Sequence, residues 1–252
     1  MATDWVFGIH AVEALIENRA EAVMRLCIQK GRNDEKIKIL QELAQCRGIS
    51  VEMMSKHDIE ALVKGNHQGV IAEVEPTKEL DEADLHALTK QLAGKKQAPF
   101  FLVLDGVTDP HNLGACVRTA NAAGVHAVIY PKDKSASLNA TVRKVASGAA
   151  DFTPMVAVTN LARTMKWMKE CGIWLVGAAG ESQQLMAAAD FTGPLALVMG
   201  SEGSGMRRLT RENCDQLVKI PMSGQVESLN VSVATGILLY EAVRQRTLSR
   251  LH

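Results

Sequence analysis

Three stretches in the second half of this sequence carry residue types that suit ligand binding and catalysis. The first, residues 105–118, brings Asn112 to the expected start of a helix and puts Arg118 about two turns further along it. A guanidinium is a permanent cation that can hold a phosphate or stabilise an oxygen as it becomes negative. Taken alone, Asn112 could simply cap the helix, and Arg118 could be an ordinary surface charge.

The second stretch, residues 199–208, contains three glycines, which let a backbone approach a ligand closely. Glu202 stands among them and is unusual for a mere turn. The glycine order is G-x-x-G-x-G, which differs from the dinucleotide-binding fingerprint, and no G-K-[ST] follows as in a phosphate-cradling loop. These two nucleotide-binding classes are therefore excluded, while a flexible turn remains the alternative.

The third stretch, residues 220–234, interleaves small hydroxyl and amide side chains with Leu and Val as a loop enters an apolar helix. Ser228 and Asn230 are its chemically capable members. The alternative is that Ser228 caps the helix and that Asn230 only lowers the helix propensity. Each of the three stretches is ambiguous by itself, so their joint occurrence narrows the function more than any one of them.

The sequence gives no sign of a metal site, because no group of His, Cys or carboxylate residues has ligand spacing. His111 is close to the first stretch and is expected to be a loop residue rather than a catalytic base. The cysteines form no C-x-x-C pair and are expected to be reduced thiols in the core. They are Cys27, Cys46, Cys116, Cys171 and Cys214.

Short, continuously apolar runs predict the elements that position these stretches. Such runs fit strands covered on both faces, and helical segments between them indicate an α/β fold with a parallel sheet. Ligands gather at the carboxyl edge of such a sheet, which is where the three stretches begin. The expected strands are residues 100–104, 127–130, 173–176 and 195–199, and the expected helices include 159–171 and 229–246. The inner half of the last helix, residues 231–239, is apolar nearly all round, so we expect the helix to be buried in the domain or against a second subunit.

The first 76 residues read as a small αβ unit of their own. We expect helices over residues 10–18 and after Asn33, and strands over residues 23–28, 49–53 and 69–74. The pattern then loosens into charged and small residues, so residues 77–98 are interpreted as a linker, with a short helix possible in its middle. The predicted domains are therefore residues 1–76 and 99–252.

Composition excludes two classes of protein. The chain has 252 residues, is 47% hydrophobic, and has no apolar run near the roughly 20 residues of a membrane span. It is also too apolar for a disordered chain. No secretory signal is visible at the start, which predicts a cytoplasmic protein. The 28 basic and 28 acidic side chains cancel, yet local groups such as Arg207, Arg208 and Arg211 leave RNA open as a partner.

Taken in order, the three stretches resemble the three motifs of SPOUT-class, TrmH/SpoU-type RNA ribose 2'-O-methyltransferases. The matching patterns are N-x-G-x-x-x-R at 112–118, G-S-E-G-x-G-x-R at 200–207 and I-P-M-x-G-x-x-x-S-L-N-V-S-V-A at 220–234. The resemblance covers residues 99–246 and departs from the family pattern at no motif position.

The resemblance extends to the N-terminal unit, where residues 8–12 and 67–70 look like a small substrate-binding domain. That domain is found in the bacterial members that methylate one guanosine ribose in the peptidyl-transferase region of 23S rRNA. The long match over residues 104–116 favours this subgroup. The resemblance implies that the N-terminal domain is similar to an RNA-binding fold of ribosomal proteins and binds 23S rRNA or a large-subunit assembly intermediate.

For the catalytic domain, the resemblance implies a deep trefoil knot, a homodimer formed through the knotted region, and S-adenosyl-L-methionine as the methyl donor. The implied donor-binding residues are Gly200, Ile220, Met222, Ser228 and Leu229. The implied catalytic residues are Asn112, Arg118, Glu202, Ser228 and Asn230. Two alternatives stay open: a tRNA ribose methyltransferase, which shares the three motifs, and a non-catalytic RNA-binding or assembly protein that has kept the fold.

Overall fold

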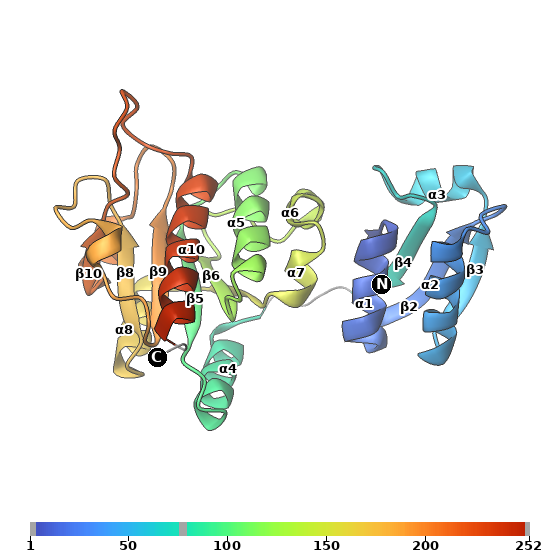
Figure 1. Ribbon diagram of the computed structural model, residues 1–252, viewed down its shortest axis with the longest axis horizontal. Helices are drawn as coiled ribbons and strands as arrows, with labels where there is room; N and C mark the ends of the chain where they lie inside the picture. Colours follow the sequence, from blue (N-terminus) through green and yellow to red (C-terminus); the bar gives the residue numbers. More distant parts are fainter. Residues whose placement is uncertain (1–3, 76–79, 250–252) are drawn as a thin grey trace. The chain divides into compact units, whose positions relative to one another are not determined.

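The chain folds into two compact units, residues 1–78 and 79–252, in a computed structural model that describes residues 4–75 and 80–249 (Figure 1). The boundary between the units lies between residues 78 and 79, near the start of the predicted linker, residues 77–98. Residues 77–79 lie outside the described residues, but helix α4 (Glu82–Gly94) buries Leu85 and Leu92 in a core of the second unit. Apolar residues at helical spacing and an Asp81 capping box form this helix, so the short helix expected in the middle of residues 77–98 is present and packs within the second unit.

The first unit is a four-stranded sheet with helices on both faces. Its strands lie in the order β1-β4-β2-β3, with β2 and β3 parallel and the other pairs antiparallel. The elements are β1 (Asp4–Phe7), α1 (Ile9–Arg19), η1 (Ala20–Ala22), β2 (Val23–Gln29), α2 (Glu35–Cys46), β3 (Ser50–Met54), α3 (Lys56–Leu62) and β4 (Val70–Val74). The predicted αβ alternation is confirmed. Sequence reasoning missed β1 and α3, and Asp34 rather than Asn33 precedes α2.

The second unit is built on a six-stranded sheet in which all paired strands are parallel, in the order β10-β8-β9-β5-β6-β7 (Figure 1). After α4, its elements are β5 (Phe100–Asp105), α5 (Pro110–Ala122), β6 (Ala127–Pro131), α6 (Ala140–Ala146), α7 (Ala149–Phe152), β7 (Met155–Val158), α8 (Leu161–Glu170), β8 (Trp174–Ala178), η2 (Met186–Ala188), β9 (Leu195–Gly200), α9 (Arg208–Asn213), β10 (Gln216–Val218) and α10 (Val231–Ser249). The predicted parallel α/β architecture is confirmed.

Helices cover both faces of this sheet, which explains the continuously apolar strands. Along β5, Phe100, Leu102 and Leu104 pack in one core with α5 and α10. Phe101 and Val103 face the other core, which α4 and α8 complete. Since successive residues of a strand point to opposite faces, every β5 side chain is buried.

Helix α10 is mostly apolar over its first half, residues 231–239, but even this half is not fully buried within its own unit. Leu238 and Leu239 lie in the core, while Val233 and Tyr240 are 50% and 52% exposed. The inner face is therefore buried within the unit, while burial of the outer face against a second subunit stays a prediction. None of the described helices is both long and apolar enough to cross a membrane.

The cysteine prediction is correct for only part of the set. Cys27 and Cys116 are buried and Cys214 is half-buried, but Cys46 and Cys171 are exposed. Both exposed thiols lie at the carboxyl ends of helices, α2 and α8, where the chain turns back at the surface. A helical neighbourhood thus does not by itself place a cysteine in the core.

Candidate active site

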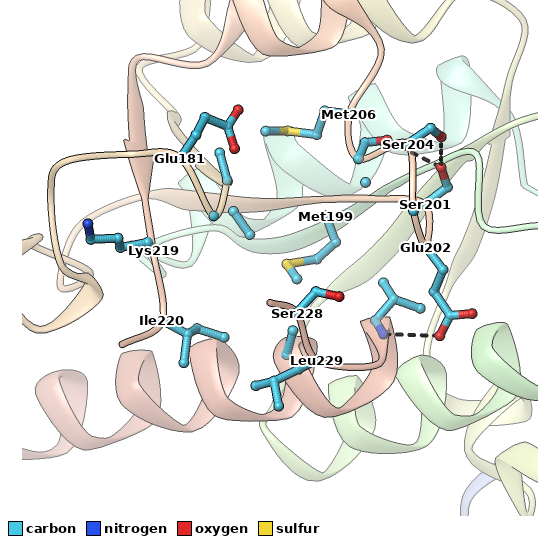
Figure 2. A pocket seen from close by; sticks show the side chains of 18 of the residues that line it. Glu181, Met199, Ser201, Glu202, Ser204, Met206, Lys219, Ile220, Ser228 and Leu229 are labelled. Atoms are coloured by element: carbon cyan, nitrogen blue, oxygen red, sulfur yellow. Dashed lines mark hydrogen bonds between the residues drawn. The ribbon is translucent and has the colours of Figure 1, made fainter. Parts of the chain in front are cut away.

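A pocket opens at the carboxyl edge of the sheet, where β5 and β9 lie side by side and Asp105 pairs with Gly200. Its volume is about 620 Å³, within the range of small-molecule sites. All five residues expected to bind a donor line it, namely Gly200, Ile220, Met222, Ser228 and Leu229. Figure 2 shows Ile220, Ser228 and Leu229 on one side of this pocket, opposite Met206 and Ser204. We call it the donor pocket.

The loop after β9 can form this wall only with glycine at position 200. A Cβ on Gly200 would lie 2.1 Å from the carbonyl carbon of Gly205 and 2.2 Å from the nitrogen of Met206. Gly203 and Gly205 have positive φ angles of 78° and 67°, which turn the loop back on itself. Ser201 closes the turn with a 2.6 Å bond to the Ser204 hydroxyl. The glycines are thus required by close backbone approach as well as by turn geometry.

The three sequence stretches meet in a hydrogen-bonded group of polar side chains, Asn112, Glu202 and Asn230, which we call the polar cluster. The Asn230 amide donates to Asn112 Oδ1 at 2.9 Å and also to Glu202 Oε1. The backbone N–H of Val231 donates to the same Glu202 oxygen at 3.4 Å. One carboxylate therefore ties the loop after β9 to the beginning of α10, as the dashed bond at Glu202 in Figure 2 indicates.

The structure also decides the capping alternatives. Asp109, not Asn112, caps α5 by accepting a bond from the His111 N–H, and Asn112 is buried. His111 lies within the first turn of α5, so its expected loop position is wrong. At α10 the Oδ1 atom of Asn230 accepts from the Ser232 N–H at 2.9 Å, so Asn230 rather than Ser228 supports the helix start.

Arg118 is the predicted site residue that the structure leaves outside both the donor pocket and the polar cluster. It is exposed on α5 and lines neither the donor pocket nor a second cavity beside that pocket. Its neighbour Thr119 faces α10, where a Cβ on Gly236 would lie 3.6 Å from the Thr119 methyl group. Arg118 is therefore an exposed residue of a helix that packs against α10, and it takes no part in the bonds of the polar cluster.

Beside the donor pocket is a second cavity of about 370 Å³, lined in part by Asp105, Asp109, Lys134, Glu202 and Arg207. Sequence reasoning gave no specific role to Asp105 or Lys134. Asp105 ends a buried strand, and a charged residue at that position is the signal that could have drawn attention to it.

Charged groups also reach the donor pocket. An ion pair joins Glu181, after β8, to Arg211 of α9, and both line the pocket together with Lys219. Sequence reasoning missed Glu181 and Lys219 because nothing in the local pattern distinguishes them from surface charges. The pocket thus combines an apolar wall with groups of both signs.

Thiol and metal chemistry have little support at this site. Burial raises the pKa of Cys116, which lies beside Thr235 beneath the polar cluster, to about 11. That thiol is therefore protonated at neutral pH and is a poor nucleophile. Among the described residues, no group of three or more His, Cys, Asp or Glu side chains is arranged to hold a metal ion.

A pocket of small-molecule size, a second polar cavity next to it, and a carboxylate–amide cluster between them mark the carboxyl edge of this α/β domain as a ligand-binding site. Comparison with protein families is more specific. Residues 99–240 match the SpoU rRNA Methylase family, and residues 5–80 match the family described as RNA 2'-O ribose methyltransferase substrate binding. The chain belongs to the SpoU rRNA methylase family.

Curated relatives resemble this chain over nearly its whole length. A protein of Escherichia coli strain K12, named 23S rRNA (guanosine-2'-O-)-methyltransferase RlmB, is 53% identical over 246 residues, covering 97% of this chain and 100% of its own. A protein of the same name from Vibrio parahaemolyticus is 54% identical over 248 residues, covering 98% of each chain.

Solved structures agree with the fold. The SpoU methyltransferase AviRb from Streptomyces viridochromogenes, in complex with the cofactor AdoMet, has a TM-score of 0.78 and 26% identity, covering 98% of this chain and 91% of its own. A TrmH/SpoU tRNA modifying enzyme of A. aeolicus has a TM-score of 0.56 and 32% identity, but it covers only 65% of this chain and 86% of its own.

Proposed function

We propose that this protein transfers a methyl group from S-adenosyl-L-methionine to the ribose 2'-hydroxyl of a specific guanosine in 23S rRNA. The observation that carries the proposal is the meeting of Asn112, Glu202 and Asn230 beside a small-molecule pocket. Relatives at 53% and 54% identity over almost the whole chain bear the name of that activity. A tRNA substrate has weaker support, because the tRNA-modifying neighbour covers only 65% of this chain.

The donor pocket fits S-adenosyl-L-methionine in size and chemistry. Met199, Ile220 and Leu229 offer an apolar wall for a purine. Arg211 and Glu181 offer charges that complement the carboxylate and ammonium of an amino acid. When bound, the sulfonium donor supplies an activated methyl carbon. Together with these side chains, Gly200, Met222 and Ser228 are the residues that would hold it.

The protein must help the acceptor hydroxyl, which ionises far above neutral pH. If the gap is about five pH units, prior ionisation costs roughly 7 kcal/mol. A positioned cation that stabilises the developing oxyanion contributes about 3 to 4 kcal/mol. Arg118 is the cation we assign to this task, acting by electrostatic stabilisation, because a guanidinium is never neutral in proteins and cannot serve as a base. The polar cluster orients the ribose and the donor.

Because Arg118 lies outside the donor pocket of its own chain, we propose that the protein is a homodimer. In it, Arg118 of one chain acts at the donor pocket of the other chain. The exposed apolar residues Val233 and Tyr240 on α10, next to the helix that carries Arg118, support this arrangement. Burying such a face against an identical one is the usual course for a symmetric dimer. A trefoil knot formed by the segments after β9 and β10 is part of the proposal and is supported by the family relationship.

The N-terminal unit is proposed to bind the RNA substrate, either as free 23S rRNA or as a large-subunit assembly intermediate. The family match over residues 5–80 supports this role. The target is proposed to lie in the peptidyl-transferase region. We also propose a cytoplasmic location, because a relative named as an rRNA methyltransferase is a bacterial protein and ribosomal RNA lies in the bacterial cytoplasm.

Methyl-transfer mapping tests the proposed function. The purified chain is incubated with methyl-labelled S-adenosyl-L-methionine and either 23S rRNA or tRNA, and the modified nucleotide is mapped. We expect label on one guanosine ribose of 23S rRNA. Label on tRNA alone would overturn the substrate assignment, and no label on any RNA would favour a non-catalytic binding protein.

A further inference from the structure

The second cavity touches the donor pocket along one wall. Ser201, Glu202, Ser204 and Val231 line both. In an in-line methyl transfer the acceptor must approach from the side opposite the leaving sulfur, so acceptor and donor occupy adjoining spaces. The second cavity is the described space that adjoins the donor pocket in this way. Its volume of about 370 Å³ falls within the range for small-ligand sites.

Arg207 is held rigidly in the wall of this cavity by Asp105. The Asp105 carboxylate is fully buried, and its Oδ1 atom accepts from Arg207 Nε at 2.6 Å and Nη2 at 2.5 Å. Its Oδ2 atom accepts from the Arg207 backbone N–H at 2.8 Å. These bonds use one edge of the guanidinium, while the side chain stays 47% exposed. The remaining edge, Nη1 with the outer hydrogen of Nη2, is a fixed pair of donors for two neighbouring acceptors.

The charges around the cavity favour a neutral ligand over a phosphate. Asp105 offsets Arg207, so Lys134, Asp109 and Glu202 are the other charged residues that line the cavity. The Asp109 Oδ1 atom accepts the helix-capping bond from His111, which leaves Oδ2 for a ligand. The cavity therefore presents a paired donor and a carboxylate acceptor with a slight negative excess. A phosphate group would be repelled by that excess.

We propose that the second cavity binds the guanine base of the acceptor nucleotide. Arg207 donates to O6 and N7, and Asp109 accepts from N1–H and the exocyclic N2 amine. Guanine is the RNA base that offers two neighbouring acceptors on one edge and two neighbouring donors on the next. Adenine would turn its N6 amine toward the guanidinium and its N1 lone pair toward the carboxylate. This assignment rests on the proposed function, and it makes Arg207 and Asp109 specificity-determining residues and Asp105 a positioning residue.

The experiment uses a synthetic fragment of 23S rRNA that carries guanosine, 7-deazaguanosine or inosine at the target position. Replacing N7 by carbon removes one acceptor of Arg207, and inosine lacks the N2 amine that faces Asp109. A bidentate arginine–guanine contact discriminates by about five- to 150-fold, so we expect the 7-deaza fragment to lose kcat/KM by a factor in that range. We expect a loss with inosine as well.

Variants assign each loss to its residue. Arg207→Ala should abolish the difference between guanosine and 7-deazaguanosine but keep the loss with inosine. Asp109→Asn keeps a good helix cap and should abolish only the inosine loss. Asp105→Asn should weaken the 7-deaza difference, because the guanidinium is no longer fixed. Arg208→Ala is the matched control, since Arg208 pairs with Glu212 at the surface and lines neither cavity.

Calorimetric binding of S-adenosyl-L-methionine to each variant checks that the donor pocket is intact. If Arg207→Ala does not fold, the wild-type comparison of the three fragments still tests the proposal. Equal rates with guanosine and 7-deazaguanosine in the wild-type protein would overturn it. So would a variant that slows both fragments equally and lowers the salt dependence, which would indicate a phosphate contact. Absence of transfer to the unmodified fragment would instead count against the proposed function.

Discussion

The polar cluster and Arg118 differ in burial and in their position relative to the two cavities, although they are close in the sequence. Asn112 and Arg118 are six residues apart on α5, yet Asn112 is buried and bonded to Asn230, while Arg118 is exposed and outside both cavities. A separation of six residues rotates a side chain about 240° around a helix, so the two point in different directions. The donor pocket is therefore built within one chain, while Arg118, which we propose as the activating cation, belongs to a different surface.

Substitutions in the two regions should therefore have different effects on the protein. Changes in the cluster or in the loop after β9 should act on donor binding, on turnover and on the stability of the chain that carries them. A change at Arg118 should act on turnover alone. The predictions below test that separation, beginning with the largest expected effect.

Arg118→Ala should lower single-turnover methyl transfer about a hundredfold to a thousandfold, because one positioned donor to a developing oxyanion is lost. The affinity for S-adenosyl-L-methionine should stay within about twofold, since Arg118 does not line the donor pocket. Rapid-quench methyl transfer and titration calorimetry measure the two quantities. Transfer at the wild-type rate would remove Arg118 from the mechanism. Arg118→Lys should be almost as slow as the alanine variant if the planar guanidinium matters.

A mixing experiment shows from which chain Arg118 acts. Arg118→Ala protein and Gly200→Ala protein should each be nearly inactive as a homodimer. If Arg118 reaches the pocket of its partner, random mixing should restore about a quarter of the wild-type sites, since half of the dimers are mixed and each has one complete site. No restored activity in dimers verified to be mixed would place Arg118 in its own chain's site and contradict the dimer proposal.

Gly200→Ala should damage the donor pocket directly. The added Cβ would lie 2.1 Å from Gly205 backbone, so the loop must shift. We expect the free energy of unfolding to fall by about 1 to 3 kcal/mol, together with weaker donor binding. Denaturant titration and calorimetry measure both. Gly180→Ala is the matched control, because Gly180 also lines the pocket but has no neighbour within 4 Å of an added Cβ. Equal effects of the two variants would mean that the close approach at Gly200 is unimportant.

Asn230 has two separable roles, one in the cluster and one at the start of α10. Asn230→Ala should lower the free energy of unfolding by about 0.5 to 2 kcal/mol and also lower kcat. Asn230→Ser keeps a capping oxygen but loses the amide that donates to Asn112 and Glu202. It should therefore recover most of the stability and little of the activity. Recovery of full activity by serine would show that only the cap matters.

Much of the fold could be predicted because its signals are local. The buried strands of the second unit are continuous apolar runs, and their parallel arrangement follows from the helices between them. Elements that were missed, such as β10 at Gln216–Val218 and α3 at Lys56–Leu62, are short, and their periodicity is too brief to read. Helix α4 was expected only as a possible short helix, because its charged ends hide an apolar stripe.

The site was predictable only as far as motifs go. The stretches at 200–207 and 220–234 line the donor pocket, and Asn112 of the first stretch bonds to Asn230 beside it, whereas Arg118 lies outside. Which residues bond to one another depends on contacts between parts of the chain about 30 to 120 positions apart, and these leave no local pattern. The pairing of Asp105 with Arg207 is of this kind, since 102 positions separate the two residues.

The smallest expected effect concerns the opposite edge of the sheet, where a substitution should change stability and leave donor binding and turnover alone, in contrast to Arg118. His126 precedes β6 there, its Nδ1 accepts from the Phe100 N–H, and burial together with nearby Arg246 lowers its pKa below the ordinary 6.5. In the unfolded chain the histidine regains its ordinary pKa, so below about pH 6.5 the unfolded state binds more protons. The free energy of unfolding should therefore fall as the pH drops from 7.5 to 5.5, and His126→Gln should reduce that dependence. Denaturant titration at both pH values measures it.

Donor affinity of the His126→Gln variant at pH 7.5 should match that of the wild type, because His126 lies at the amino edge of the sheet, away from the pocket. A variant with unchanged pH dependence would mean that other groups dominate, and a variant with altered donor affinity would mean that the two edges are coupled.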